Sequence, residues 1–268
     1  MTQRDPSTHD SLRETLAGGD LTIEGRLVAA SNATLRGIAH GDEGSVTCVI
    51  KPVAGERPLW DFPEGTLTGR EIAAYELSEA LGWHLVPTTL WREDTLVGPA
   101  MVQEWIVEVD EERPVGIWPV AEVPEPWAVI VEGNDGAGHA VALAHDRRSD
   151  LQQLAIFDAI CNNADRKGGH VLADASGRLW GIDHGVTFSD EDKLRTVLWG
   201  WAGEAIPPEL VSDVASLADR LDAGLPGVET WLTESEIEAL QRRVSDLVAT
   251  GVFPLPPADW PAIPWPIM

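Results

Sequence analysis

Two aspartates lie in segments whose composition suits chemistry on a phosphate. Asp165 belongs to CNNADRKGGHVL and Asp183 to WGIDHGVTF. The residues between them predict a hairpin that turns at Ala175-Ser176-Gly177, which would place both aspartates in loops at one end of a short strand pair. In-line phosphoryl transfer needs one carboxylate beside the acceptor hydroxyl and another on a metal ion. Each aspartate alone could equally cap a turn, but that explanation is weaker for the pair.

A lysine and an acidic helix precede this pair. Lys51 ends the β-branched run VTCVI and stands before Pro52, where a lysine is commonly solvated. The apolar spacing predicts a helix over residues 70–81, which carries Glu71 and Glu76. Either could hold the lysine, although residues five positions apart cannot share a helix face. Because Glu76 lies beside the apolar stripe, the helical wheel favours Glu76.

A third candidate is the turn of the hairpin expected over residues 25–38. Small polar side chains there could let backbone N–H groups face phosphate oxygens. The segment contains neither GxGxxG nor a Walker loop, and an ordinary hairpin turn explains it equally well. The residues of this candidate phosphate loop are Ser31, Asn32, Ala33 and Thr34.

The remaining pattern predicts an α+β protein of two lobes. Residues 1–18 are expected to form a flexible tail, residues 19–109 a lobe of antiparallel strands with one helix, and residues 110–268 a mainly helical lobe. The second lobe should contain a hairpin within residues 129–145, a helix at 151–162 and two amphipathic helices, the last opened by Thr233 and Glu236 in capping-box spacing. The proline-rich end should form an extended strap that packs its tryptophans on this lobe.

Composition limits the classes of partner. Nineteen Lys and Arg against 44 Asp and Glu give a net charge of −25, which disfavours nucleic acid and anionic membranes as partners, although it could also serve solubility alone. The start of the chain has no apolar signal core, and the two cysteines form no disulfide framework. We therefore expect a cytoplasmic protein with reduced thiols.

Several motifs together resemble the phosphatidylinositol 3- and 4-kinase-like family. They are VIKP, GREIAAYELSEALG followed by VP, MVQEWI, DRKGGH and IDHGVTF. CNNADRKGGH with KLRTVLWGWAGE is similar to an actinobacterial branch of that family. The resemblance runs from about Gly25 to Pro207 and implies a two-lobed kinase fold that uses ATP with Mg²⁺ or Mn²⁺.

The resemblance also implies roles for individual residues. Lys51 would contact the α- and β-phosphates and Glu71, in preference to Glu76, would hold it. Asp165 would be the catalytic base and Asp183 would chelate the metal, while residues 31–34 would cover the phosphates. The hinge that offers backbone groups to adenine would be Glu104, Trp105 and Ile106.

One position departs from the family pattern. Family members usually carry an asparagine metal ligand five residues after the catalytic aspartate, where this chain has His170. Imidazole suits Mn²⁺ better than Mg²⁺. His170 is therefore either a ligand that favours manganese or a non-ligand that leaves one metal site weakened.

The segment after Asp183 bears on the acceptor. It holds Asp190, Glu191 and Asp192 before Lys193 and Arg195, where family lipid kinases carry basic residues for inositol phosphates. A protein hydroxyl or a small polar metabolite therefore fits better as acceptor, and hydroxyls in the N-terminal tail make phosphorylation of the chain by itself conceivable. Two other hypotheses are an ATP-binding regulatory protein without transfer activity, and a nucleotidyltransferase on a kinase-like fold.

Overall fold

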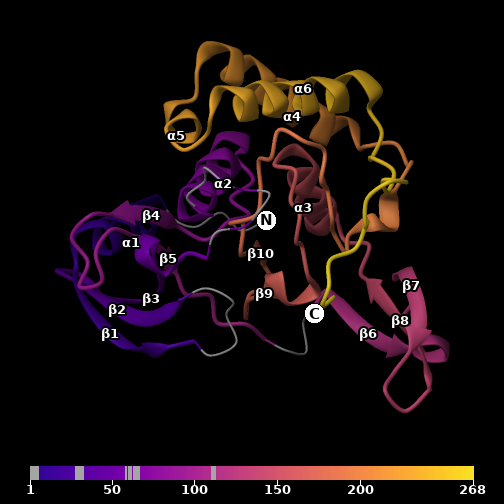
Figure 1. Cartoon of the computed structure of the whole chain (residues 1–268), viewed down its shortest axis with the longest axis horizontal. Coiled ribbons are helices and arrows are strands. Elements are labelled where there is room, and N and C mark those ends of the chain that lie inside the picture. The colour runs from indigo at the N-terminus through magenta and orange to yellow at the C-terminus, as the bar shows by residue number, and fades with distance from the viewer. Residues whose placement is uncertain (1–5, 28–32, 58, 60–61, 63–66, 110–112) are drawn as a thin grey trace.

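A computed structural model describes residues 6–27, 33–57, 59, 62, 67–109 and 113–268. The antiparallel sheet of the N-terminal part lies at one side of the molecule, and the long helices of the C-terminal part lie above and beside it (Figure 1). The α+β architecture expected from the sequence is confirmed. Among the helices of the described ranges, none is long and apolar enough to cross a bilayer.

The N-terminal sheet has five antiparallel strands in the order β1-β2-β3-β5-β4. Its central strand β3 contains the predicted β-branched run, whose Cys48 and Ile50 are fully buried. The expected antiparallel strands are confirmed, and the β2–β3 turn lies at residues 42 and 43. The strands are β1 (Asp20–Arg26), β2 (Leu35–Gly41), β3 (Gly44–Pro52), β4 (Thr89–Arg92) and β5 (Ala100–Glu104).

The expected flexible tail is wrong for most of its length, because Pro6–Gly18 forms helix α1 against this sheet. Leu16 is fully buried and Leu12 packs beside the same apolar cluster. Their spacing of four places both on one helix face, a signal too short to stand out in a polar segment. The Arg13 guanidinium donates to the Tyr75 hydroxyl at 3.2 Å, which ties α1 to the next helix.

Helix α2 (Leu67–Leu81) begins three residues before the predicted start and ends, as predicted, at Gly82, whose φ is +70°. It is buried around nearly its whole circumference, between the sheet and helices α4 (Pro208–Ala223) and α5 (Pro226–Glu229). Such a helix has no single apolar stripe, so a helical wheel cannot identify its inward acid.

The C-terminal part begins with a three-stranded sheet in the order β6-β8-β7. The predicted hairpin is confirmed as β7 (Ala128–Asn134) and β8 (Ala140–His145), while β6 (Val115–Pro119) lies in a proline-rich stretch that gave no strand signal. The predicted helices are confirmed as α3 (Ser149–Ile160), α4 and α6 (Glu234–Thr250), which opens with the expected capping box. Strands β9 (Val171–Ala173) and β10 (Leu179–Gly181) form the second hairpin.

The C-terminal segment is extended, as expected, and follows the surface from α6 down to the β9 region (Figure 1). Its anchoring differs from the expectation, because the packed side chains include Phe253, Ile263, Ile267 and Met268. Trp265 is instead 82% exposed. Aliphatic residues between the prolines, rather than the tryptophans alone, therefore attach the strap.

The packing of α1 generates a stability prediction. Leu16→Ala should lower the free energy of unfolding by about 2–5 kcal/mol, because it leaves a cavity between α1 and the sheet. The control is Leu96→Ala, a residue 77% exposed, which should change it by less than about 0.5 kcal/mol. Urea unfolding measures both, and equal effects would show that α1 is not docked.

Candidate active site

The centre of the candidate site is an ammonium group shared by two carboxylates. Lys51, near the end of β3, forms ion pairs with Glu71 of α2 and with Asp183 of the loop after β10, the latter at 2.9 Å. The lysine is 17% exposed and Glu71 only 2%, whereas Asp183 is 48% exposed. The three side chains come from segments far apart in the sequence, so the fold itself assembles this triad.

Each member of the triad has a perturbed pKa. Burial opposes the charge on Lys51, but Asp183 and Glu71 outweigh it and raise the lysine pKa. Lys51 lowers the pKa of Asp183 well below its usual range. Burial raises the pKa of Glu71, although Lys51 and the His184 N–H, which donates to Glu71 at 3.0 Å, favour its charged form. Lysine and aspartate are thus held charged at neutral pH.

The structure brings Lys51 to Glu71 and not to Glu76. Glu76 instead forms an ion pair with Arg13 of α1 at 3.6 Å. The preference of the helical wheel for Glu76 is therefore wrong for the contact itself, because α2 is buried on both sides.

His170 lies beside the carboxylate oxygen of Asp183 that does not pair with Lys51, at 3.3 Å from Nε2 to Oδ2. Burial lowers the pKa of His170, so the imidazole is neutral at pH 7. Its Nδ1 is buried without a hydrogen-bond partner among the described residues. An imidazole nitrogen beside a carboxylate oxygen is a donor pair suited to a divalent transition ion.

Asp165 belongs to the same electrostatic neighbourhood. Both Asp165 and Asp183 act to raise the pKa of His170 against its burial. The Asp165 carboxylate is 30% exposed and accepts from Lys167 Nζ at 2.8 Å. Lys167, which the sequence reasoning did not single out, therefore supplies a second cation within the DRKGGH segment.

A fully buried ion pair fixes the two loops that carry the aspartates. Arg166 and Asp158 of α3 are both 0% exposed and are joined by three hydrogen bonds of 2.9–3.0 Å. The same guanidinium donates to the carbonyls of Ile182 at 2.8 Å and His170 at 3.2 Å. Sequence reasoning missed this pair; its signals were an aspartate inside the apolar run LAIFDAI and an arginine directly after Asp165.

His184 is part of the same buried network. Its Nε2 lies 2.6 Å from Arg166 Nη2, and burial lowers its pKa well below the usual range. A neutral ring can accept from the guanidinium there. His184 therefore acts as a hydrogen-bonding member of this network.

The candidate phosphate loop is described only in part. Ser31 and Asn32 lie outside the described residues. The N–H of Ala33 donates to the Gly55 carbonyl at 3.3 Å, and Thr34 is 4% exposed. Because its N–H is used within the protein, Ala33 does not offer the free backbone donor that was expected.

The candidate hinge is also partly committed to the protein. The N–H of Glu104 donates to Thr88 and that of Trp105 to Thr47, both at 2.9 Å. These two donors are therefore used within the protein, and the hinge role of residues 104–106 stays a prediction. The Arg36 guanidinium lies 5.4 Å from the centroid of the Trp105 ring.

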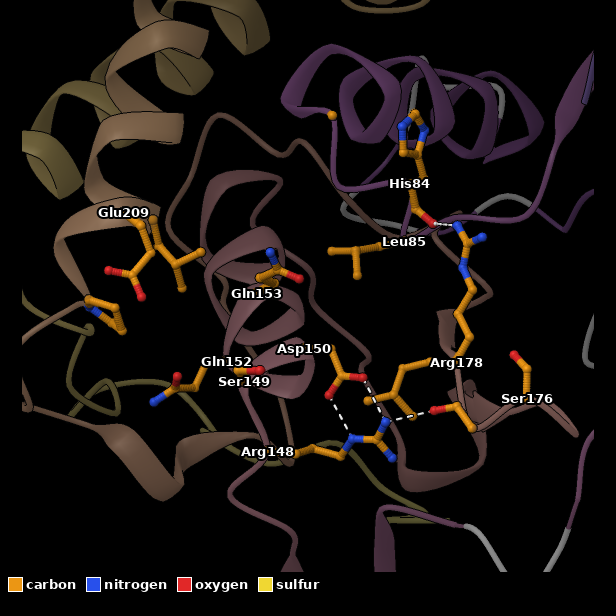
Figure 2. Close-up of a pocket in the computed structure, with 15 residues that line it drawn as sticks. His84, Leu85, Arg148, Ser149, Asp150, Gln152, Gln153, Ser176, Arg178 and Glu209 are labelled. Carbon is orange, nitrogen blue, oxygen red and sulfur yellow. Dashed lines mark hydrogen bonds and ion pairs between the residues drawn. The ribbon is translucent and has the colours of Figure 1, made fainter. Parts of the chain in front are cut away.

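A separate cavity of about 830 Å³ lies behind the β9–β10 turn, between the starts of α3 and α4 (Figure 2). Its polar walls bind one another: Arg148 pairs with Asp150 at 2.7 Å and donates to Gly177, and Arg178 donates to the His84 carbonyl. None of the predicted site residues lines it. The candidate chemistry therefore belongs to the triad and not to this cavity.

The chain is 44% identical over 268 residues to Protein Rv2133c of Mycobacterium tuberculosis (strain ATCC 25618 / H37Rv), across 96% of this chain and 95% of that protein. The chain belongs to the Rv2133c family. No family model matches it.

Two solved structures share its architecture. Hydra Fam20 with sugar aligns with a TM-score of 0.57 at 15% identity, over 93% of this chain and 90% of its own. The Golgi casein kinase with Mn/ADP bound aligns with a TM-score of 0.54 at 13% identity, over 91% and 75%. At these identities the likeness shows the fold alone, which is kinase-like. A relationship to the phosphatidylinositol 3- and 4-kinases is not among these findings.

The buried pair generates a second stability prediction. Asp158→Ala should lower the free energy of unfolding by about 3–5 kcal/mol, because it leaves the Arg166 charge buried without its partner. The matched control is Glu204→Ala, which removes the half-exposed partner of Arg147 and should cost less than about 1 kcal/mol. Denaturant unfolding compares the two, and similar losses would contradict the structural role of the pair.

Proposed function

We propose that this protein is an ATP-dependent phosphotransferase of the atypical kinase type. The observation that carries the proposal is the sharing of Lys51 between Glu71 and Asp183. A buried glutamate that fixes a lysine beside a half-exposed aspartate is the arrangement phosphoryl transfer uses to hold phosphates and metal. The kinase-like fold supports the same reading.

The lysine and its acids would bind the nucleotide. Glu71 holds Lys51 in place, and triphosphate oxygens would compete with Asp183 for the ammonium group. The Golgi casein kinase was solved with Mn/ADP bound, which supports the use of a nucleotide and a divalent metal by this fold.

Asp183 and His170 would hold the metal ion. Their facing oxygen and nitrogen fit a divalent cation. No described residue bonds the His170 Nδ1, so no such bond fixes the tautomer of the ring. Among the residues the structure describes, no group of three or more His, Cys, Asp or Glu side chains could hold a metal ion. The remaining ligands would have to come from nucleotide or water. When bound, the ion would neutralise charge on the phosphates.

Asp165 would act as the base for the acceptor hydroxyl. It is partly exposed, lies in the neighbourhood of His170 and Asp183, and is held by a backbone N–H bond to Asn163 at 2.9 Å. Lys167 beside it would balance charge on the transferred group.

The acceptor that fits best is a protein hydroxyl or a small polar metabolite. Asp190, Glu191 and Asp192 are exposed on the segment after Asp183, whereas Lys193 is 4% exposed. An acidic surface there disfavours a phosphoinositide head group at an anionic membrane. The resemblance to phosphatidylinositol kinases therefore concerns the motifs and not the acceptor. The cytoplasmic location and the absence of nucleic-acid and membrane partners stay expectations.

The test is the intact mass of the protein and of candidate acceptors after incubation with Mn-ATP or Mg-ATP. A gain of one phosphoryl group supports the proposal, and a gain of a nucleotide would replace it with nucleotidyl transfer. Bound ATP with no gain on any acceptor or on the chain supports a regulatory ATP-binding protein. One observation favours this second candidate: His170 stands where the phosphatidylinositol 3- and 4-kinase-like family usually has an asparagine metal ligand.

The two aspartates should behave differently. Asp183→Ala should abolish metal-dependent ATP binding, measured by calorimetry, because it removes the carboxylate beside Lys51. Asp165→Ala should retain ATP affinity within about twofold while turnover falls about 100-fold or more, as expected for a group that acts in the transition state. Asp190→Ala is the exposed control. Full turnover in Asp165→Ala would remove Asp165 from the role of base.

His170 should set the metal preference. His170→Asn should raise turnover or binding with Mg²⁺ relative to Mn²⁺, because a carboxamide oxygen is a harder ligand than imidazole. His84→Asn, on the wall of the separate cavity, is the control. A Mn²⁺/Mg²⁺ ratio identical to that of the unmodified protein would show that the His170 ring does not bind the metal.

A further inference from the structure

We propose that the C-terminal strap, residues 260–268, is a positioning element that holds the middle of the loop between Asp165 and His170. The chain runs from α6 past the loop after residue 196 and ends beside the β9 region (Figure 1). Its importance for turnover rests on the proposed function. Its contact with the loop does not.

Two backbone carbonyls of the strap accept hydrogen bonds from the rest of the protein. The carbonyl of Ala262 accepts from the Thr196 N–H at 3.0 Å and from Trp199 Nε1 at 2.9 Å. The carbonyl of Ile267 accepts from the Gly168 N–H at 2.9 Å. The first attachment fixes the strap to the C-terminal part, and the second joins it to the DRKGGH segment.

Side-chain packing strengthens the second attachment. A Cβ added at Gly168 would come closer to Met268 Sδ than real Cβ atoms come to any neighbour, and would lie 3.0 Å from Met268 Cε. On the other side it would meet Val115 Cγ1 of β6 at 3.2 Å. Gly168 is thus enclosed between the strap and β6, and a side chain at this position would have to displace the end of the Met268 side chain.

The two ends of the loop have other supports. Arg166 is anchored by Asp158, and its backbone N–H donates to the Arg195 carbonyl at 3.0 Å. At the other end, Val171 enters the β9–β10 ladder opposite Gly181. Neither of these supports holds Gly168, which lies between them in the sequence. The strap therefore supplies the anchor at this position.

The consequence concerns turnover more than nucleotide binding. Lys51 and Glu71 are held by β3 and α2, and Asp183 by the loop after β10, so these contacts do not run through the strap. Asp165 and His170 flank the segment that the strap holds. Small displacements of catalytic groups cost far more in rate than in affinity.

The first test follows backbone hydrogen exchange of residues 165–171 by mass spectrometry. A variant that ends at Ala262 keeps the first attachment and loses the Gly168 bond, so exchange in this segment should rise at least about tenfold. Trp265→Ala, at the exposed position of the same strap, is the matched control and should leave exchange unchanged. Met268→Ala should give a smaller rise in the full-length chain. Unchanged exchange in both shortened and Met268→Ala proteins would overturn the proposal.

The second test perturbs the same contact from the loop side. Gly168→Ala should displace Met268, raise exchange in the strap, and lower turnover about 10- to 100-fold. The affinity for Mn-ATP should fall less than turnover, because Lys51 and Asp183 keep their positions while His170 shifts. Adding Met268→Ala should recover part of the lost turnover. A loss of ATP affinity equal to the loss of turnover would overturn the positioning role. If the unmodified protein transfers no phosphoryl group, the exchange result alone still decides whether the strap holds the loop.

Discussion

The buried pair of Asp158 and Arg166 is the interaction on which the candidate site depends. Two charges removed from water are tolerated only when nearly every donor and acceptor is used. Arg166 meets this demand through Asp158, His184 and the carbonyls of His170 and Ile182. One guanidinium therefore joins a core helix to both loops that bear aspartates, so the distance between those loops is set from the protein interior.

The sequence predicted most of the fold, because strands, caps and loop motifs are local signals. Lys51 and Asp183 were given separate roles from the sequence, and the structure places them 2.9 Å apart. What local signals could not give was long-range pairing. The apolar sequence around Asp158 shows that this aspartate is buried. Its pairing with Arg166 cannot be recognised from the sequence, because it forms only when the loop after α3 packs back on that helix.

Two failures have the same physical origin. The tail prediction missed α1 because its buried face consists of few apolar residues, and the helical wheel chose the wrong acid because α2 is covered on both sides. In each case tertiary packing, not the local pattern, decides which face is inside. The same holds for the strap. Trp265 is exposed and Ile267 is packed because the path of the backbone, and not the size of the side chain, decides which residue faces the core.

The charges of the site indicate how it would be used. By formal charge, Lys51 and Lys167 contribute two positive charges and Glu71, Asp165 and Asp183 three negative ones, while His170 is neutral. The cluster is therefore negative by one unit inside a chain of net charge −25. A triphosphate without a metal ion would be repelled by this negative cluster. Phosphate oxygens that compete for Lys51 would also leave the Asp183 carboxylate without its positive partner, and a divalent cation bound to the triphosphate would supply that positive charge. The electrostatics thus favour a metal–nucleotide complex as the species that enters.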